Sequence, residues 1–253
     1  MSVFRSIAMA FACFSVIPMP QGEWDERNMR YMMAAFPLVG ACIGLVVWLW
    51  DLLCGQLGFG SVLRAAGFTL IPILISGGIH LDGFADVVDA QSSHAEPDRK
   101  REILKDPHAG AFAIIGVACY LLAYFGLATE VSPTHILALA CVPVISRVFS
   151  GLATVSFEGS KQDGMLAKER DASSSGVVSV VLALLLLVVV ALLAWQDFVV
   201  GASCIVVAAV VLATTKLFAD RAFGGFSGDL AGFYLQVAEL AMLAAIVFVG
   251  RVV

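Results

Sequence analysis

Long apolar runs alternate with short polar connections along most of the chain. Each run is about as long as the roughly 20 apolar residues that cross a bilayer as a helix. Because the runs are unbroken, they indicate helices and exclude a transmembrane barrel, whose strands alternate over about ten residues. The sequence therefore predicts an all-α, polytopic integral membrane protein with about seven transmembrane helices. The expected spans are residues 31–52, 59–79, 109–128, 135–155, 177–195, 198–218 and 233–250.

The segment before residue 21 is apolar but short for a span. Arg5 is followed by an apolar run of about a dozen residues, which ends at Pro18 and Pro20. A signal peptide has a similar pattern, but no soluble domain follows. We therefore predict an uncleaved interfacial or re-entrant segment. No internal repeat or long linker divides the chain, so residues 1–253 are expected to form a single membrane domain.

Composition agrees with a membrane location and limits the partners. Of the 253 residues, 60% are hydrophobic and 14% are charged, and the mean hydropathy is +0.94, as in chains that contact the lipid bilayer. The formal net charge of −5 comes with no basic patch, which argues against nucleic acid as a partner. The six cysteines have no zinc-binding or C-x-x-C spacing. Homo-oligomerisation is left open.

Basic residues are divided unequally between the two sets of loops. With the loops assigned alternately, one side receives only Arg64 and Arg251, while Arg147 falls inside a span. The positive-inside rule places the other side in the cytoplasm, so we expect a multi-pass protein of the cell inner membrane with its active site facing the cytoplasm. Twelve of the 15 basic residues make up that side: Arg5, Arg27, Arg30, Arg99, Lys100, Arg101, Lys105, Lys161, Lys168, Arg170, Lys216 and Arg221.

Three carboxylates follow the apolar run that ends at Ile75. On a helix that begins after Gly78, Asp82, Asp86 and Asp89 lie at positions i, i+4 and i+7 and project from one face. Like charges at this spacing repel one another unless a cation offsets them. Oxygen ligands without cysteine suit Mg²⁺, which is usually shared with substrate phosphates. The alternative is a solvated acidic helix start.

Small and charged residues on either side of this cluster are candidates for substrate binding. Gly77 and Gly78 allow a phosphate or another backbone to come close. Further along, Arg101 and Lys105 can neutralise phosphate, and Asp106 adds a carboxylate. The alternative for this second group is an ion-paired surface helix, with Asp98 as its N-terminal cap and Asp106–Pro107 as its end.

Two ionisable residues, Arg147 and Glu239, lie inside predicted spans. A charge at membrane depth costs several kcal/mol unless it is paired or faces a cavity, so a structural ion pair and a polar substrate cavity are both open explanations. The glycine-rich loop before the last span can bring backbone amides to a phosphate, with Asp229 as a metal ligand or a helix cap. An ordinary turn is the alternative for this loop.

Taken in order, these motifs resemble those of the cobalamin-5'-phosphate synthases, also called adenosylcobinamide-GDP ribazoletransferases. The family's Gly-Gly-x-His-Leu-Asp-Gly-x-Ala-Asp-x-x-Asp block begins here at Gly77 and ends at Asp89. Its later Gly-Gly-x-Thr-Gly-Asp-x-x-Gly block begins at Gly224, with Ser227 in place of the usual Thr. The resemblance covers nearly the whole chain, and the other matching residues are Phe36 to Gly40, Glu102, Ile103, Leu104, Asp106, Pro107, Ser146, Arg147 and Glu239.

The resemblance implies a Mg²⁺-dependent transferase that joins adenosylcobinamide-GDP to α-ribazole or its 5'-phosphate and releases GMP. It implies His80 as candidate general base, with orientation of a ligand carboxylate as the alternative role for this histidine, and Arg147 and Lys105 as phosphate binders. The implied metal ligands are Asp82, Asp86, Asp89 and Asp229. The implied substrate-binding residues are Gly77, Gly78, Arg101, Asp106, Gly225, Ser227, Gly228 and Glu239.

Two other functions are weighed against this one. A CDP-alcohol phosphotransferase also carries aspartates on membrane helices, but its Asp-x-x-Asp-Gly-x-x-Ala-Arg pattern is absent, since Asp86 stands where Arg would follow Ala85. A cation transporter would distribute acids along its spans toward both faces. Here the acids gather at one predicted membrane edge, which favours an enzyme.

Overall fold

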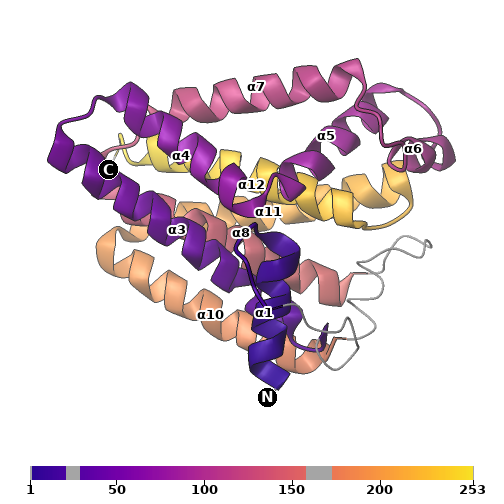
Figure 1. Ribbon diagram of the computed structural model, residues 1–253, viewed down its shortest axis with the longest axis horizontal. Helices are drawn as coiled ribbons and strands as arrows, with labels where there is room; N and C mark the ends of the chain where they lie inside the picture. Colours follow the sequence, from indigo (N-terminus) through magenta and orange to yellow (C-terminus); the bar gives the residue numbers. More distant parts are fainter. Residues whose placement is uncertain (1, 21–28, 158–172, 253) are drawn as a thin grey trace.

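The computed structural model describes residues 2–20, 29–157 and 173–252, and its elements are helices (Figure 1). Among the described residues, six helices are long and apolar enough to cross a membrane, and the bent pair α4 and α5 makes seven if counted as one span. The predicted all-α membrane fold is confirmed. In chain order the elements are α1 (Ser2–Phe14), α3 (Met32–Leu57), α4 (Ser61–Ser76), α5 (Ile79–Ser92), α6 (Pro97–Ile103), α7 (Ala111–Ala128), the 3₁₀ turn η1 (Pro133–His135), α8 (Ile136–Ser156), α10 (Ser175–Gln196), α11 (Phe198–Phe223) and α12 (Gly228–Val249).

Two glycines turn the chain between α4 and α5. Gly77 and Gly78 both have left-handed backbone angles, with φ of 66° and 78°, which side chains with a Cβ adopt at a cost. The amide of Gly78 donates to the carbonyl of Ile73 at 3.0 Å and closes the end of α4. The two helix axes consequently meet at 95°. The span predicted over residues 59–79 therefore ends at Ser76, and a second helix leaves in a new direction.

Helix α3 packs closely along α8. A methyl group on Gly40 would lie 2.3 Å from the carbonyl oxygen of Pro143, and one on Gly44 would lie 2.0 Å from that of Ala140. Glycines four residues apart lie on one helix face and let two backbones approach, a common arrangement between membrane helices. This contact fixes α8 in the middle of the bundle, where most of its side chains are buried.

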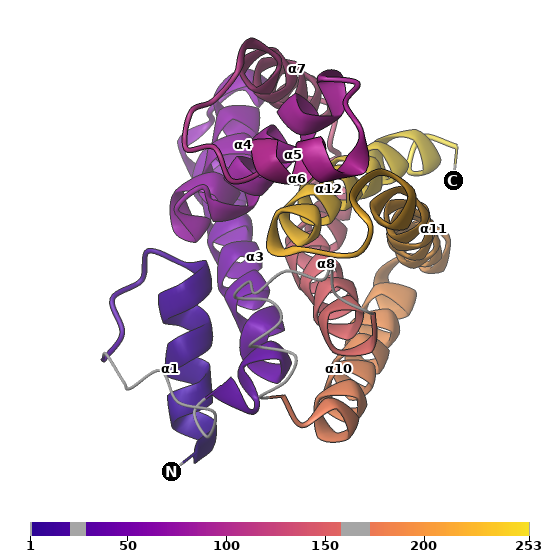
Figure 2. The same cartoon turned by 90° about the vertical axis from the view of Figure 1, so that its right-hand side faces the viewer.

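The N-terminal helix α1 lies beside α3 at the edge of the bundle (Figure 2). Met9 and Ala10 pack against Met32 and Met33 of α3. After α1 the chain reaches the end of α4, where the amide of Val16 donates to the carbonyl of Ile75 at 2.8 Å. At 13 residues, α1 is shorter than a span, as expected, and its interfacial or re-entrant placement stays a prediction.

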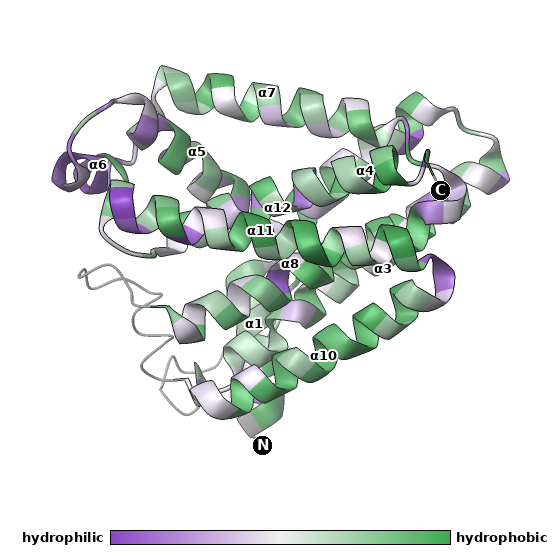
Figure 3. Ribbon diagram, turned by 180° about the vertical axis from the view of Figure 1, so that it is seen from behind, coloured by the Kyte–Doolittle hydropathy of each residue, from purple (hydrophilic) through white to green (hydrophobic). Residues whose placement is uncertain are grey.

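Polar and apolar surfaces are separated along the helix axes. Apolar side chains cover the flanks, whereas α6 is hydrophilic (Figure 3). Arg64 and Arg251 both contact the connection that follows α7, where the first donates to the carbonyl of Val131 and the second pairs with Glu130. Figure 1 shows α6 at the opposite end of the molecule. This arrangement agrees with the predicted division of basic residues, although Arg27, Lys161, Lys168 and Arg170 lie outside the described residues.

Candidate active site

Two glycines allow α5 and α12 to cross in close contact. A methyl group on Gly232 would lie 2.9 Å from the carbonyl oxygen of His80, and one on Gly83 would lie 3.0 Å from the Cα of Asp229. The neighbouring atoms belong to backbone, so they cannot move aside as a flexible side chain can. The crossing therefore requires glycine at both positions, and it brings the start of α5, with Asp82, beside the first turn of α12.

Four carboxylates share this crossing. Asp82, Asp86 and Asp89, called here the α5 carboxylates, all lie on the predicted helix. The charges of Asp82, Asp229 and Asp89 act on Asp86. Asp89 also has a local partner, because its Oδ1 accepts a hydrogen bond of 3.3 Å from the amide of Ala113 in the first turn of α7, where the helix dipole favours a negative charge. Asp86 therefore feels the charges of the other three predicted metal ligands, although no three acidic, histidine or cysteine side chains of the described residues are placed to hold one metal ion together.

A cavity of about 230 Å³ is lined by two of these carboxylates, Asp82 and Asp229, whereas Asp86 and Asp89 do not line it. Its polar wall includes His80, Asp82, Gly228 and Asp229, all of which the sequence predicted as site residues. Helices α1, α3, α5, α8 and α12 contribute to it, so elements from both ends of the sequence enclose one space. The remaining lining residues are Phe14, Met33, Phe36, Ile79, Gly83, Ser150, Thr154, Ala231, Gly232 and Leu235.

His80 is held between aromatic rings in the wall of this cavity. Its ring lies 6.0 Å from that of Phe14, nearly parallel to it, and 5.7 Å from that of Phe36. The residue is only 6% exposed, and its Nε2 has no hydrogen-bond partner within the described part of the chain. A buried polar atom without a partner is uncommon in folded proteins. His80 therefore has a nitrogen available for a ligand or a proton.

A more open hollow of about 370 Å³ adjoins the cavity at the start of α5. It contains the two glycines of the bend, Gly77 and Gly78, together with Leu81, Ala85 and Val117. Asp82 and Ile79 line both spaces. A ligand in the cavity and a ligand in the open hollow would therefore meet at the carboxylate of Asp82.

The glycine-rich loop ends in a capped helix start. Gly224 and Gly225 have φ of 71° and 143°, and the hydroxyl of Ser227 accepts a hydrogen bond of 3.3 Å from the amide of Leu230. The cap of α12 is therefore Ser227, while Asp229 lies in the first turn. Because the cap position is filled, the Asp229 carboxylate remains available to the cavity.

The charged segment around α6 is not part of the cavity wall. Arg101 donates to the carbonyl of Phe223 at 2.9 Å, which fastens α6 to the end of α11, and it pairs with Asp98. The prediction that Asp98 caps α6 is wrong, because the capping position belongs to Glu96, whose side chain makes no capping hydrogen bond. Lys105 is exposed, so it is free to move toward a bound phosphate.

Asp106 follows α6 in an exposed loop. Its carboxylate binds the amide of His108 at 3.0 Å and the ring Nδ1 of the same residue at 2.7 Å. The side-chain hydrogen bond from His108 is the main reason that the pKa of Asp106 lies below its ordinary value. Asp106 is therefore charged and has a local partner, and the structure does not bring it into the cavity.

Arg147 and Glu239 form a buried ion pair. Nη1 of Arg147 lies 2.7 Å from Oε1 of Glu239, and the two side chains are 2% and 3% exposed. The same Oε1 accepts a hydrogen bond of 2.8 Å from Ser146, and Nη1 also donates to the carbonyl of Pro143. Neither member of the pair lines the 230 Å³ cavity; both line a separate space of about 10 Å³, which has no room for a substrate. Of the two explanations left open by the sequence, this geometry favours the structural pair.

Several cavity residues were not identified from the sequence. Phe14, Met33 and Phe36 come from the first two helices and resemble ordinary apolar positions. A signal did exist in α8, because Ser146, Ser150 and Thr154 repeat every four residues and form a polar stripe on one helix face. All three are buried, and a polar stripe inside an apolar span is a sign of a polar interior.

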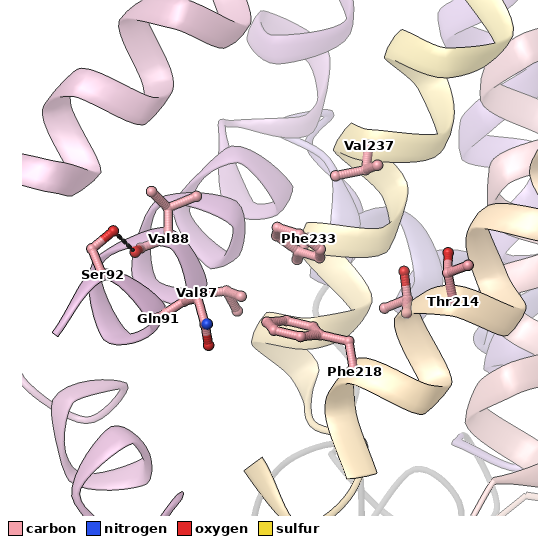
Figure 4. Close-up of a pocket in the computed structure, with 9 residues that line it drawn as sticks. Val87, Val88, Gln91, Ser92, Thr214, Phe218, Phe233 and Val237 are labelled. Carbon is pink, nitrogen blue, oxygen red and sulfur yellow. Dashed lines mark hydrogen bonds between the residues drawn. The ribbon is translucent and has the colours of Figure 1, made fainter. Parts of the chain in front are cut away.

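The largest of the described hollows has a different character. It measures about 440 Å³ and lies between α5, α11 and α12 (Figure 4). Val87, Val88, Phe218, Phe233 and Val237 form most of its wall, and its polar lining residues are all uncharged. With no titratable group in its wall, this hollow offers no means of acid–base or metal chemistry.

An all-helical, multi-pass protein with two carboxylates and a histidine in the wall of one cavity belongs to the class of integral membrane enzymes. The chain is a member of the cobalamin-5-phosphate synthase family, whose sequence profile matches residues 6–247. It is 39% identical over 254 aligned positions to an adenosylcobinamide-GDP ribazoletransferase of Lachnoclostridium phytofermentans, covering 100% of this chain and 97% of the relative. Proteins of the same name from Clostridium botulinum (strain Alaska E43 / Type E3; 96% of each chain covered) and Geobacillus thermodenitrificans (91% of this chain, 90% of the relative) are each 31% identical to it. No solved structure matches the chain.

Proposed function

We propose that this protein is an adenosylcobinamide-GDP ribazoletransferase. It joins adenosylcobinamide-GDP to α-ribazole 5'-phosphate, or to α-ribazole, and so contributes to cobalamin biosynthesis. The family membership and the names of the relatives support this activity over a CDP-alcohol phosphotransferase or a cation transporter. The observation that carries the proposal is the meeting of His80, Asp82 and Asp229 in the wall of one cavity.

The reaction is a phosphodiester exchange at the phosphorus on the cobinamide side of the diphosphate. A ribose hydroxyl of the acceptor forms a new oxygen–phosphorus bond, the bond from that phosphorus to the GMP oxygen breaks, and GMP leaves with the electron pair. The hydroxyl proton needs a base, and His80 is our candidate because its Nε2 has no partner among the described residues. Exposed Lys105 is the candidate that neutralises the departing phosphate.

The carboxylates have the chemistry required to hold Mg²⁺. They are hard oxygen donors that repel one another. Among the described residues, no three aspartate, glutamate, histidine or cysteine side chains lie close enough together to bind one metal ion. Three protein ligands are not required, because Mg²⁺ is usually held by one or two carboxylates together with water and substrate phosphates. Asp82, Asp86 and Asp229 would hold it, with Asp89 as the outermost member. Bound there, Mg²⁺ would offset charge on the phosphate oxygens.

Arg147 has an indirect role in this arrangement. Its guanidinium carbon lies 5.6 Å from the centre of the Phe36 ring, and Phe36 contacts His80. The ion pair with Glu239 therefore positions the wall that holds the histidine. Direct binding of phosphate by Arg147 stays a prediction, which the double substitution described in the Discussion tests.

The site is proposed to face the cytoplasm from the cell inner membrane. The supporting observation is that α6, with its four basic residues Arg99, Lys100, Arg101 and Lys105 at or next to it, lies at the end of the molecule away from Arg64 and Arg251. Nucleoside diphosphate substrates are also cytoplasmic compounds.

The activity is tested with purified protein in lipid nanodiscs, supplied with adenosylcobinamide-GDP, α-ribazole 5'-phosphate and Mg²⁺. GMP release is expected with the wild-type protein and is expected to stop when Mg²⁺ is chelated. His80→Asn should lower turnover about 10²- to 10⁴-fold, as expected for a lost general base. Asp220→Asn is a control, because Asp220 is an exposed carboxylate outside the cavity wall that pairs with Lys216. A folded wild-type protein that releases no GMP would refute the proposal.

A further inference from the structure

The volume of the cavity limits what can enter it. A cavity of about 150 Å³ holds benzene, and pockets for drug-sized ligands measure roughly 300–1,000 Å³. At about 230 Å³, this one admits a single small ring system and excludes a corrinoid. Assuming the transferase activity proposed above, we propose that the cavity is the acceptor site, which receives the planar base of α-ribazole, while the corrinoid substrate stays in the open hollow.

The walls of the cavity suit an apolar ring. Met33, Phe36 and Leu235 are each at most 3% exposed and offer no conventional hydrogen-bond group. Among the α8 residues, the hydroxyl of Thr154 already donates to the carbonyl of Ser150 at 3.0 Å. A benzimidazole-type base has few polar atoms and loses little in such a space. At the apolar end formed by Met33, Phe36 and Leu235, guanine, the other planar base of the reaction, would leave its amide and amino groups unpaired, which is costly.

The two hollows also give the substrates a meeting point. The ribose and its hydroxyl would lie at the polar end of the cavity, which His80, Asp82 and Asp229 line. The diphosphate of the large substrate would approach through the open hollow beside Gly77 and Gly78. Because Asp82 borders both spaces, the phosphorus that is attacked would lie next to its carboxylate. The apolar wall residues, rather than the carboxylates, would then decide which acceptor bases are used.

Filling the cavity is the direct test. Ala231→Leu adds a branched side chain at the cavity wall, and Ala245→Leu makes the same change elsewhere on α12, at a half-buried position outside the wall. We expect Ala231→Leu to raise KM for α-ribazole 5'-phosphate about ten- to hundredfold, the effect of overpacking. KM for adenosylcobinamide-GDP should not change, and Ala245→Leu should behave as wild type.

Other outcomes decide against the inference. An unchanged KM for the acceptor, or a raised KM for the corrinoid substrate alone, would show that the cavity holds something else. If Ala231→Leu does not fold, Met33→Ala decides, because an enlarged cavity should shift kcat/KM toward an acceptor whose base has one more fused ring. No shift in that ratio would overturn the acceptor-site assignment.

A binding measurement separates this inference from the proposed function. Equilibrium dialysis of labelled α-ribazole 5'-phosphate against the wild-type protein in nanodiscs does not depend on turnover. Binding that Ala231→Leu weakens and Ala245→Leu preserves would support the acceptor site even if no GMP were released. If wild type releases GMP but wild type, Ala231→Leu and Ala245→Leu bind the acceptor equally well, the transferase activity is supported and the assignment of the cavity as the acceptor site is refuted.

Discussion

The buried pair of Arg147 and Glu239 gives the sharpest prediction about stability and function together. Three variants are compared with wild type: Arg147→Met, Glu239→Leu and the double substitution. Each replacement has a similar shape but no charge. A structural pair predicts that the single variants are damaged and that the double variant recovers both stability and turnover, because the charges matter only to each other.

The magnitude follows from the burial of the pair. In Glu239→Leu the Arg147 side chain, 2% exposed, keeps as hydrogen-bond partners among the described residues the carbonyl of Pro143 and the hydroxyl of Ser146, both uncharged. An uncompensated charge of this kind costs about 3–5 kcal/mol, whereas apolar replacement of both partners is often neutral or stabilising. We therefore expect a coupling free energy of roughly 3 kcal/mol or more between the two sites.

The assay scores the two properties separately. Thermal unfolding in detergent reports stability, and GMP release in nanodiscs reports turnover. The reasoning is refuted if the double variant unfolds at the wild-type temperature but stays inactive, because that result would show that turnover needs the Arg147 guanidinium itself and not only a neutralised pair. It is also refuted if each single variant is as stable as wild type, since the pair would then contribute nothing.

Three further predictions concern the carboxylates, the helix crossing and the topology. Changing any one of the α5 carboxylates to Asn should abolish most GMP release. The triple change should lower GMP release little further than the most damaging single change, because the effects of residues that act as a unit are non-additive. Near-normal turnover in one variant would show that its residue is not a metal ligand. Gly232→Ala should destabilise the protein by about 1–3 kcal/mol through overpacking. Gly126→Ala is the control, because a methyl group at this helical site would have no neighbouring atom within 4 Å, and it should be neutral or stabilising in thermal unfolding. Equal melting temperatures of the two variants would contradict this prediction. In a cysteine-free background and right-side-out vesicles, an impermeant thiol reagent should label cysteine introduced at Gln196 but not at Ser92, and the reverse pattern would invert the topology.

Hydropathy predicted which segments are helices better than it predicted where they end. A long apolar run records contact with lipid, so the existence of the spans was readable from the sequence. The start of α12 was not, because the run begins at Phe233 while the helix begins at Gly228. The missing turn is stabilised by the Ser227 cap and by packing against α5, neither of which raises hydropathy.

The candidate site divides in a similar way. The α5 carboxylates were found because their spacing is local and one helix determines their common face. The apolar part of the cavity wall was not found, because residues such as Phe14 and Met33 are distant in the sequence from the α5 carboxylates and reach the cavity only through the packing of α1 and α3. Apolar residues carry no signal that separates a cavity wall from a lipid-facing surface until the tertiary contacts are known.

The close crossing of α5 and α12 explains why carboxylates and glycines occur together in both sequence blocks. Gly83 directly follows Asp82, and Gly232 lies one helical turn after Asp229, so each glycine contact lies within a turn of a carboxylate. Because the contact is made by backbone atoms, the repulsion between the carboxylates cannot be relieved by a small shift of side chains in the crossing. Relief must come from a cation, a proton or a movement of whole helices. The two glycines therefore hold Asp82 and Asp229 near each other, and under the proposed function this closeness would favour the binding of a counter-ion.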